Sequence, residues 1–267
     1  METYRLKRIV IVLLALVNLF LLGLLLNFRW QGSRSRQALS QALAELYADN
    51  QIQLPQGLDA SAASLTPMGV TRSEQEEAAF AQALVGEDAR AQDRGGGIYV
   101  YTGSYGSVRF RSSGSFDYAP PDRAVDDPEA FCRDLCEQFG YRELSSTLDQ
   151  GTGTFTALRQ ISGHDVYNCS LSAVFEDGNL ISLSGTWISG AGAAQPDPAA
   201  STAADALVDF LDYRNANGIL CSAVRAVEPV YELLSGADGA SLAPRWQITT
   251  DTYRYYVDCS TGAILRA

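Results

Sequence analysis

Residues 127–140 read DPEAFCRDLCEQFG, and this stretch carries both the start and the stop signal of a helix. Asp127 is a typical amino-terminal cap, Pro128 suits the first helical position, and Gly140 suits the end. The apolar side chains between them recur at helical spacing: Phe131, Leu135, Cys136 and Phe139. The stretch therefore predicts an amphipathic helix with one buried face.

Strands are predicted directly after this helix, at 153–161, 164–175 and 180–189. Asp177-Gly178 between the last two favours a hairpin turn. The same order occurs earlier in the chain. There Ser73 and Glu76 have the spacing of a capping box, in which each side chain bonds the backbone N–H of the other residue. The strands expected after that first helix are 98–101 and 107–111.

A third helix is predicted over 201–215, closed by Asn217-Gly218, and strands follow it at 219–234, 244–250, 253–258 and 262–266. The recurring order of one helix and then antiparallel strands predicts an α+β fold, with one helix packed on each sheet. We divide the chain into four parts: an anchor at 1–29, a membrane-proximal helix and connector at 30–72, and α+β subdomains at 73–190 and 191–267.

The anchor is predicted from residues 9–28, IVIVLLALVNLFLLGLLLNF, which hold no charged side chain. About 20 apolar residues are needed to cross a bilayer, and signal peptides, the alternative, have shorter apolar runs with small residues at the cleavage site. Residues 1–29 hold four basic residues and one acidic residue and so carry a net charge of +3. Because the whole chain carries −11, the remaining residues carry −14. So acidic a remainder excludes nucleic acid as a partner and favours an extracytoplasmic domain with a cytoplasmic amino terminus.

One side of this helix could contact another membrane helix. Small residues let two helices approach closely, and an intramembrane Asn can hydrogen-bond across the contact. The residues we expect there are Ala15, Asn18, Leu19, Leu22 and Gly23. A plain anchor with a tolerated Asn explains them equally well.

Signals of catalysis or metal binding are sparse. His164, the only histidine, lies in a turn, and no Gly-x-Ser-x-Gly elbow supports a serine nucleophile. Cys132, Cys136, His164 and Cys169 could form a zinc set, but His164 and Cys169 would point to opposite faces of a strand. Small apolar core residues are the better interpretation of the two helical cysteines. We therefore expect a binding or regulatory module with no cofactor and no catalytic or metal site, rather than an enzyme.

Cys221 begins one strand-rich stretch and Cys259 ends another, so a cross-strand disulfide could join them. Because the chain has five cysteines, at least one stays a thiol if every bridge is internal.

Five segments near the two ends of the chain are similar to those of a known family: Tyr4-Arg5-Leu6-Lys7-Arg8-Ile9-Val10-Ile11, Leu16-Val17-Asn18-Leu19-Phe20-Leu21, Pro244-Arg245-Trp246-Gln247-Ile248, Tyr255-Tyr256-Val257-Asp258 and Thr261-Gly262. With these segments the chain resembles YycI-type regulatory proteins of Gram-positive bacteria. The resemblance implies a non-enzymatic, membrane-anchored accessory protein of the WalRK (YycFG) two-component system. It would contact the sensor histidine kinase and a YycH-like protein through its membrane helix and outer domain, as a homodimer or heterodimer, and so adjust the control of cell-wall metabolism.

Two other function classes stay open. The repeated helix-plus-strands unit resembles PepSY-like modules, which implies a peptide-binding or protease-inhibiting role at the cell surface. An extracytoplasmic hydrolase that uses His164 is the third alternative, and it predicts that His164→Ala abolishes activity.

Overall fold

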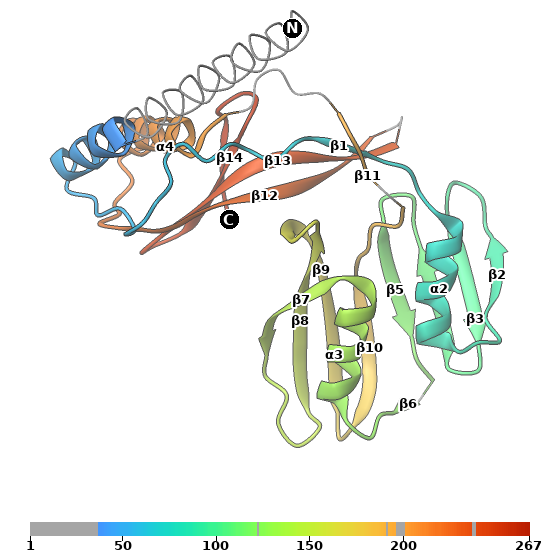
Figure 1. Ribbon diagram of the computed structural model, residues 1–267. Helices are drawn as coiled ribbons and strands as arrows, with labels where there is room; N and C mark the ends of the chain where they lie inside the picture. The colour runs from blue at the N-terminus through green and yellow to red at the C-terminus, as the bar shows by residue number, and fades with distance from the viewer. Residues whose placement is uncertain (1–36, 122, 191, 196–200, 237–238) are drawn as a thin grey trace, which may run out of the picture.

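The computed structural model describes residues 37–121, 123–190, 192–195, 201–236 and 239–267 of the chain. These residues form two halves, each a β-sheet with helices on one side (Figure 1). The halves join where β9 (His164–Glu176) pairs in parallel with β12 (Val224–Gly236), with Val166 opposite Tyr231.

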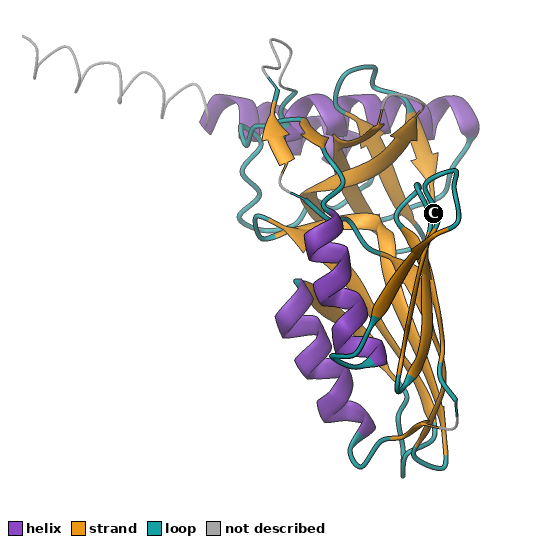
Figure 2. Cartoon of the chain, turned by 90° about the vertical axis from the view of Figure 1, so that its right-hand side faces the viewer, coloured by secondary structure: helices purple, strands orange, loops and turns teal. Residues whose placement is uncertain are grey.

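The first half consists of two runs of one helix followed by strands that pair edge to edge. The strand order is β2-β3-β4-β5-β10-β9-β8-β7, with β6 paired to one end of β10. Its helices lie side by side on one face of the sheet (Figure 2). The elements of the first run are α2 (Glu74–Val85), β2 (Arg90–Asp93), β3 (Tyr99–Gly103), β4 (Gly106–Phe110) and β5 (Ser115–Ala119). Those that follow are β6 (Arg123–Ala124), α3 (Pro128–Phe139), β7 (Tyr141–Ser146), β8 (Gly153–Ile161), β9 and β10 (Asn179–Thr186).

The second half has the helix at 37–49 and α4 (Ala203–Asn217) beside one another over its sheet (Figure 1). The Tyr47 hydroxyl donates to the Leu207 carbonyl at 2.7 Å and joins the two helices. The sheet is built from one long hairpin with short strands added at both sides. Its strands are β1 (Met68–Val70), β11 (Gly192–Ala194), β12, β13 (Gly239–Thr250), β14 (Arg254–Asp258) and β15 (Ile264–Arg266).

Each half encloses its own apolar core. In the first half Phe80 of α2 meets the rings of Phe110, Phe116, Phe139 and Trp187 at centroid distances of 4.6–5.8 Å. In the second half Trp246 and Tyr255 lie under the two helices. Burying a large apolar side chain contributes roughly 1.5–3 kcal/mol, so these aromatic side chains dominate the stability of both cores.

The helix boundaries agree with the sequence signals, with one correction. Ser73 caps α2 by accepting from the Glu76 N–H, but the Glu76 carboxylate accepts from the Gly190 N–H at 2.8 Å and does not complete a capping box. The Ser73 N–H donates to the Ser189 hydroxyl instead. A complete box occurs on α4, between Thr202 and Asp205.

The predicted fold class, with one helix for each separate meander and a membrane helix in front, is wrong for the part of the chain that the structure describes. Both α2 and α3 share one sheet, and a mixed, strand-rich sheet of 15 strands connects all the units. The reason is that a sheet edge has unpaired N–H and C=O groups, and β5 and β10 satisfy these groups by pairing with each other. Among the described residues, no helix combines the length and apolar character needed to span a bilayer.

Candidate functional site

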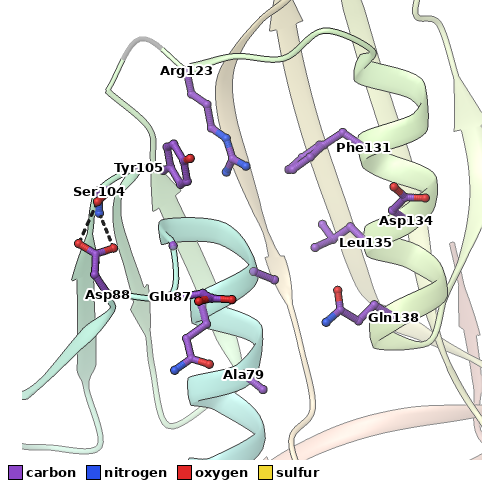
Figure 3. Close-up of a pocket in the computed structure, with 13 residues that line it drawn as sticks. Ala79, Glu87, Asp88, Ser104, Tyr105, Arg123, Phe131, Asp134, Leu135 and Gln138 are labelled. Carbon is purple, nitrogen blue, oxygen red and sulfur yellow. Dashed lines mark hydrogen bonds between the residues drawn. The ribbon is translucent and has the colours of Figure 1, made fainter.

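A groove of about 870 Å³ lies between α2 and α3 (Figure 3). One wall is α2 with the loop after it, and the other wall is α3. The turn between β3 and β4 and the short strand β6 close one end. The groove is lined by Ala79, Gln82, Ala83, Gly86, Glu87, Asp88, Ser104, Tyr105, Arg123, Phe131, Asp134, Leu135 and Gln138.

Small side chains on α2 make room for this groove. Ala79 and Ala83 are four residues apart and therefore lie on the same helix face. Phe131 and Leu135 of α3 point toward that face in Figure 3. The helices touch instead through Phe80 and Phe139, whose ring centroids are 4.6 Å apart. The alanine-rich part of α2 thus leaves space where larger side chains would pack against α3.

Arg123 is the central polar side chain of the groove. Its guanidinium lies between the rings of Tyr105 and Phe131, 4.8 Å and 5.0 Å from their centroids. One nitrogen, Nη1, donates to the Leu84 carbonyl at 2.6 Å and to the Tyr118 hydroxyl. No carboxylate of the described residues forms an ion pair with Arg123. A cation held between aromatic rings without a counterion is well placed to receive an anionic or carbonyl oxygen.

Acidic groups lie at the same end of the groove. Asp88 accepts from the backbone N–H and the hydroxyl of Ser104, and these bonds lower the pKa of its carboxyl. Glu87 and Asp134 are exposed on the two walls. The groove therefore offers separate contacts for both signs of charge, as the two ends of a peptide or its side chains require.

A second hollow, of about 480 Å³, shares Ala79 and Gln138 with this groove. It lies where α3 ends, beside Gly140, Arg159 and Trp187. The two hollows together extend along α2 and α3. Each of these helices has 12 residues and is therefore about 18 Å long, at 1.5 Å per residue. An extended peptide of about five or six residues has that length.

His164, the residue of the hydrolase alternative, lies elsewhere. It lines a cleft of about 540 Å³ between the halves, together with Arg142, Asp165 and Arg254. Asp165 accepts from Arg142 and from Gln160, which lowers the pKa of its carboxyl although burial opposes this shift. The described lining of the cleft contains no Ser or Cys side chain that His164 could activate.

The cysteines do not converge on a metal ion within the described residues. Cys132 and Cys136 face the core of the first half, whereas Cys169 belongs to a small core between the halves. No group of three or more described His, Cys, Asp or Glu side chains has the geometry of a metal site. Cys221 and Cys259 are both buried in the core of the second half, and the bridge between them stays a prediction.

The residues predicted for helix contact, Ala15 to Gly23, lie outside the described part of the chain, so that prediction stays untested. Sequence reasoning identified the apolar faces of α2 and α3 but missed Tyr105 and Arg123. No local pattern singles out Tyr105 in the Gly103-Ser104-Tyr105-Gly106 turn, because single exposed apolar residues are common on protein surfaces.

Comparison with known proteins gives fold similarities only. No protein-family model matches the chain, and no curated protein matches it. A crystal structure of an uncharacterised protein from Eubacterium rectale is similar over 80% of this chain and 85% of its own, with 11% identity and a TM-score of 0.42. The C-terminal domain of Bacillus megaterium YpeB is similar over 74% of this chain and 99% of its own, with 14% identity and a TM-score of 0.37.

Both similarities are weak, and we infer no function from either. Neither similarity provides direct evidence for a YycI-type protein, so the resemblance at the two ends of the sequence stays a prediction. What remains for a functional conclusion is the geometry of the groove itself.

Proposed function

We propose that this chain is a non-enzymatic peptide-binding module whose ligand lies in the groove between α2 and α3. The observation that carries the proposal is the Arg123 guanidinium, held between Tyr105 and Phe131 without a carboxylate partner among the described residues. A peptide supplies carbonyl and carboxylate oxygens for this cation and side chains for the aromatic walls. The proposal takes up the peptide-binding alternative of the PepSY-like resemblance and assigns it to the residues of this groove.

The regulatory alternative depends on other parts of the chain. A sensor-kinase regulator would use the helix-contact residues between 15 and 23, which the structure does not describe. Kinase and YycH-like partners, and the location at a cell membrane, therefore stay predictions. Peptide binding in the groove is compatible with them but does not require them.

The test uses the full chain, immobilised in mild detergent because residues 9–28 are apolar, and panned against a phage library of random hexapeptides. We expect the recovered peptides to bind at least tenfold more weakly to Tyr105→Ala and to Arg123→Gln. The matched control is Arg109→Gln. Arg109 is exposed on β4 between the buried residues Val108 and Phe110, so it points to the opposite face of the sheet.

Tyr105 is the safer of the two variants, because its side chain is 51% exposed, whereas Arg123 also holds the end of α2. Recovered peptides that bind both variants and the control alike would place the site outside the groove and overturn the proposal. Chromatography of each peptide after incubation with the protein checks that the module is non-enzymatic, because a cleaved peptide would show that the protein is an enzyme.

A further inference from the structure

The hollow at the end of α3 has a different chemistry from the rest of the groove. Its floor is formed by Phe139, Gly140, Arg159 and Trp187, and its rim carries the exposed carboxylates Glu76 and Glu137. Two of its lining side chains carry buried hydrogen-bond donors without an acceptor, and carboxylates lie at its rim.

Arg159 is a half-buried cation in this floor. Its Nη1 donates to the carbonyls of Phe139 and Gly140, at the carboxyl end of α3. Its Nε is buried and has no acceptor, and no described carboxylate forms an ion pair with it. Burial lowers the pKa of the guanidinium, because the charge loses its hydration there. A half-buried cation of this kind is stabilised by an anion that supplies an acceptor for its buried Nε–H.

Trp187 is a second donor without an acceptor. The side chain is 4% exposed and stacks on Phe80 at a centroid distance of 4.8 Å, and its Nε1–H has no hydrogen-bond partner. In contrast, Nε1 of the buried Trp246 donates to the Ser201 hydroxyl at 3.2 Å. Leaving a buried donor unpaired is unfavourable, so two such donors beside one hollow indicate an oxygen ligand.

The rim adds a preference for positive charge. The Glu76 carboxylate accepts from the Gly190 N–H and lies close enough to Arg159 to raise the pKa of its guanidinium, while Glu137 is exposed on α3. These two carboxylates disfavour a free anion at the entrance and favour a ligand that carries a cation next to its acidic group.

We propose that this hollow binds the C-terminal carboxylate of a peptide, with a basic side chain at the penultimate position lying against Glu76 and Glu137. The inference rests on the proposed function, because the rest of the peptide would follow the groove toward Arg123. To the proposed function it adds the direction in which the peptide lies along the groove and the chemical groups at its C-terminal end. Free anions such as inorganic phosphate could offer the same oxygens, and the experiment separates the two sources.

The experiment follows the Trp187 Nε1–H and Arg159 Nε–H resonances of the ¹⁵N-labelled full chain in detergent micelles. Trp187→Phe assigns the first resonance, since it removes the N–H and keeps an aromatic ring. The probes are the acetylated pentapeptide Ala-Ala-Ala-Lys-Ala with a free carboxylate, the same peptide as its C-terminal amide, and inorganic phosphate.

We expect the acid to bind at least tenfold more tightly than the amide and to shift both resonances. Trp187→Phe and Arg159→Gln should reduce the ratio of acid to amide affinity, and Glu137→Gln, an exposed substitution, should weaken the acid peptide without changing that ratio. Arg109→Gln serves again as the control and should change neither quantity.

Each other outcome overturns a defined part of the proposal. Equal affinities for the acid peptide and the amide peptide, with resonance shifts only near Arg123, would overturn the carboxylate site. The proposal of a peptide-binding groove would then still stand. A response to phosphate as large as the response to the acid peptide assigns the hollow to free anions and overturns the peptide end. A chain that responds to no probe here, and from which no peptide is recovered by panning, overturns both this inference and the proposed function.

Discussion

At the residue scale, one ion pair secures the start of α2 and so one wall of the groove. Glu77 is 3% exposed, and both of its oxygens accept from Arg72, at 2.7 Å and 2.8 Å. Arg72 also donates to the Gly97 carbonyl at 2.6 Å and lies over the Tyr99 ring. A buried carboxylate that loses its partner is strongly destabilising, because its charge stays away from water.

We predict that Arg72→Ala lowers the free energy of unfolding by about 3–5 kcal/mol, measured by urea denaturation with circular dichroism. Arg133→Ala is the matched control, because its pair with Glu129 is exposed on both sides, and it should change stability by less than about 0.5 kcal/mol. The double variant Arg72→Met with Glu77→Leu should recover most of the loss. Equal effects of Arg72→Ala and Arg133→Ala would contradict the prediction.

A second residue-scale prediction concerns Cys132, whose thiol is buried under α3. Burial raises the pKa of this thiol to about 12, from an ordinary value of 9.0. Between these values the unfolded chain ionises the thiol while the folded protein keeps it neutral. The stabilisation is therefore complete below about pH 9 and is lost as the pH rises toward 12.

We predict that Cys132→Ala makes the free energy of unfolding less dependent on pH between 9.5 and 11, by about 1.4 kcal/mol per pH unit. The measurement is urea denaturation at several pH values in a reducing buffer. The substitution also changes stability at every pH, so the slope is the informative quantity. An unchanged slope would show that the Cys132 thiol ionises equally in both states.

At the scale of elements, the seam between β5 and β10 decides the architecture of the first half. Gly185 lies in β10 at this seam, opposite Phe116 of β5 and Leu171 of β9. A Cβ at Gly185 would clash with the Ser170 carbonyl oxygen and would lie 2.9 Å from the Leu171 Cα. Only glycine lets β10 approach β9 so closely at this position.

We predict that Gly185→Ala destabilises the protein by about 1–3 kcal/mol, the range for overpacking, as measured by thermal unfolding. Ser184→Ala, one residue earlier and exposed, should have an effect within about 0.5 kcal/mol. If Gly185→Ala is as stable as Ser184→Ala, β9 and β10 can move apart without loss, and their close approach beside the β5–β10 seam is not a fixed part of the fold.

The elements that sequence reasoning missed have weak patterns. All four side chains of β2 are exposed, and Arg90-Ala91-Gln92-Asp93 has no alternation of apolar and polar residues. Such a short, polar edge strand forms because β3 offers backbone partners, a condition that no local pattern shows. The helices were found because their caps and apolar faces are local properties of the chain.

At the scale of the whole molecule, Asn168 of β9 joins the two halves. Its side-chain amide donates to the Leu233 carbonyl and its oxygen accepts from the Leu233 N–H, both at 2.8 Å. Next to it, Tyr167 stacks on Tyr256 of β14 with centroids 3.7 Å apart. The amide thus takes the place of a backbone group between two strands that pair at a single position.

We predict that Asn168→Ala, which leaves both Leu233 groups unpaired, weakens the junction by about 1–3 kcal/mol. Differential scanning calorimetry should then resolve two unfolding transitions, one for each half, where the unaltered chain shows more cooperative unfolding. Asn179→Ala is the control, because that side chain bonds only within its own turn. Identical thermograms for the two variants would mean that other contacts couple the halves.

The sequence by itself determined α2, α3 and α4, most of the long strands and the apolar core faces, because caps, turns and periodicity act over a few residues. Only the tertiary structure decided that two units share one sheet, that a parallel pairing connects the halves, and that α2 and α3 leave a groove. The groove residues Tyr105, Arg123, Arg159 and Trp187 come from separate parts of the chain, and each is unremarkable in its local sequence. They become a site because the packing of the sheet and helices brings them together, and no periodicity along the chain encodes that proximity.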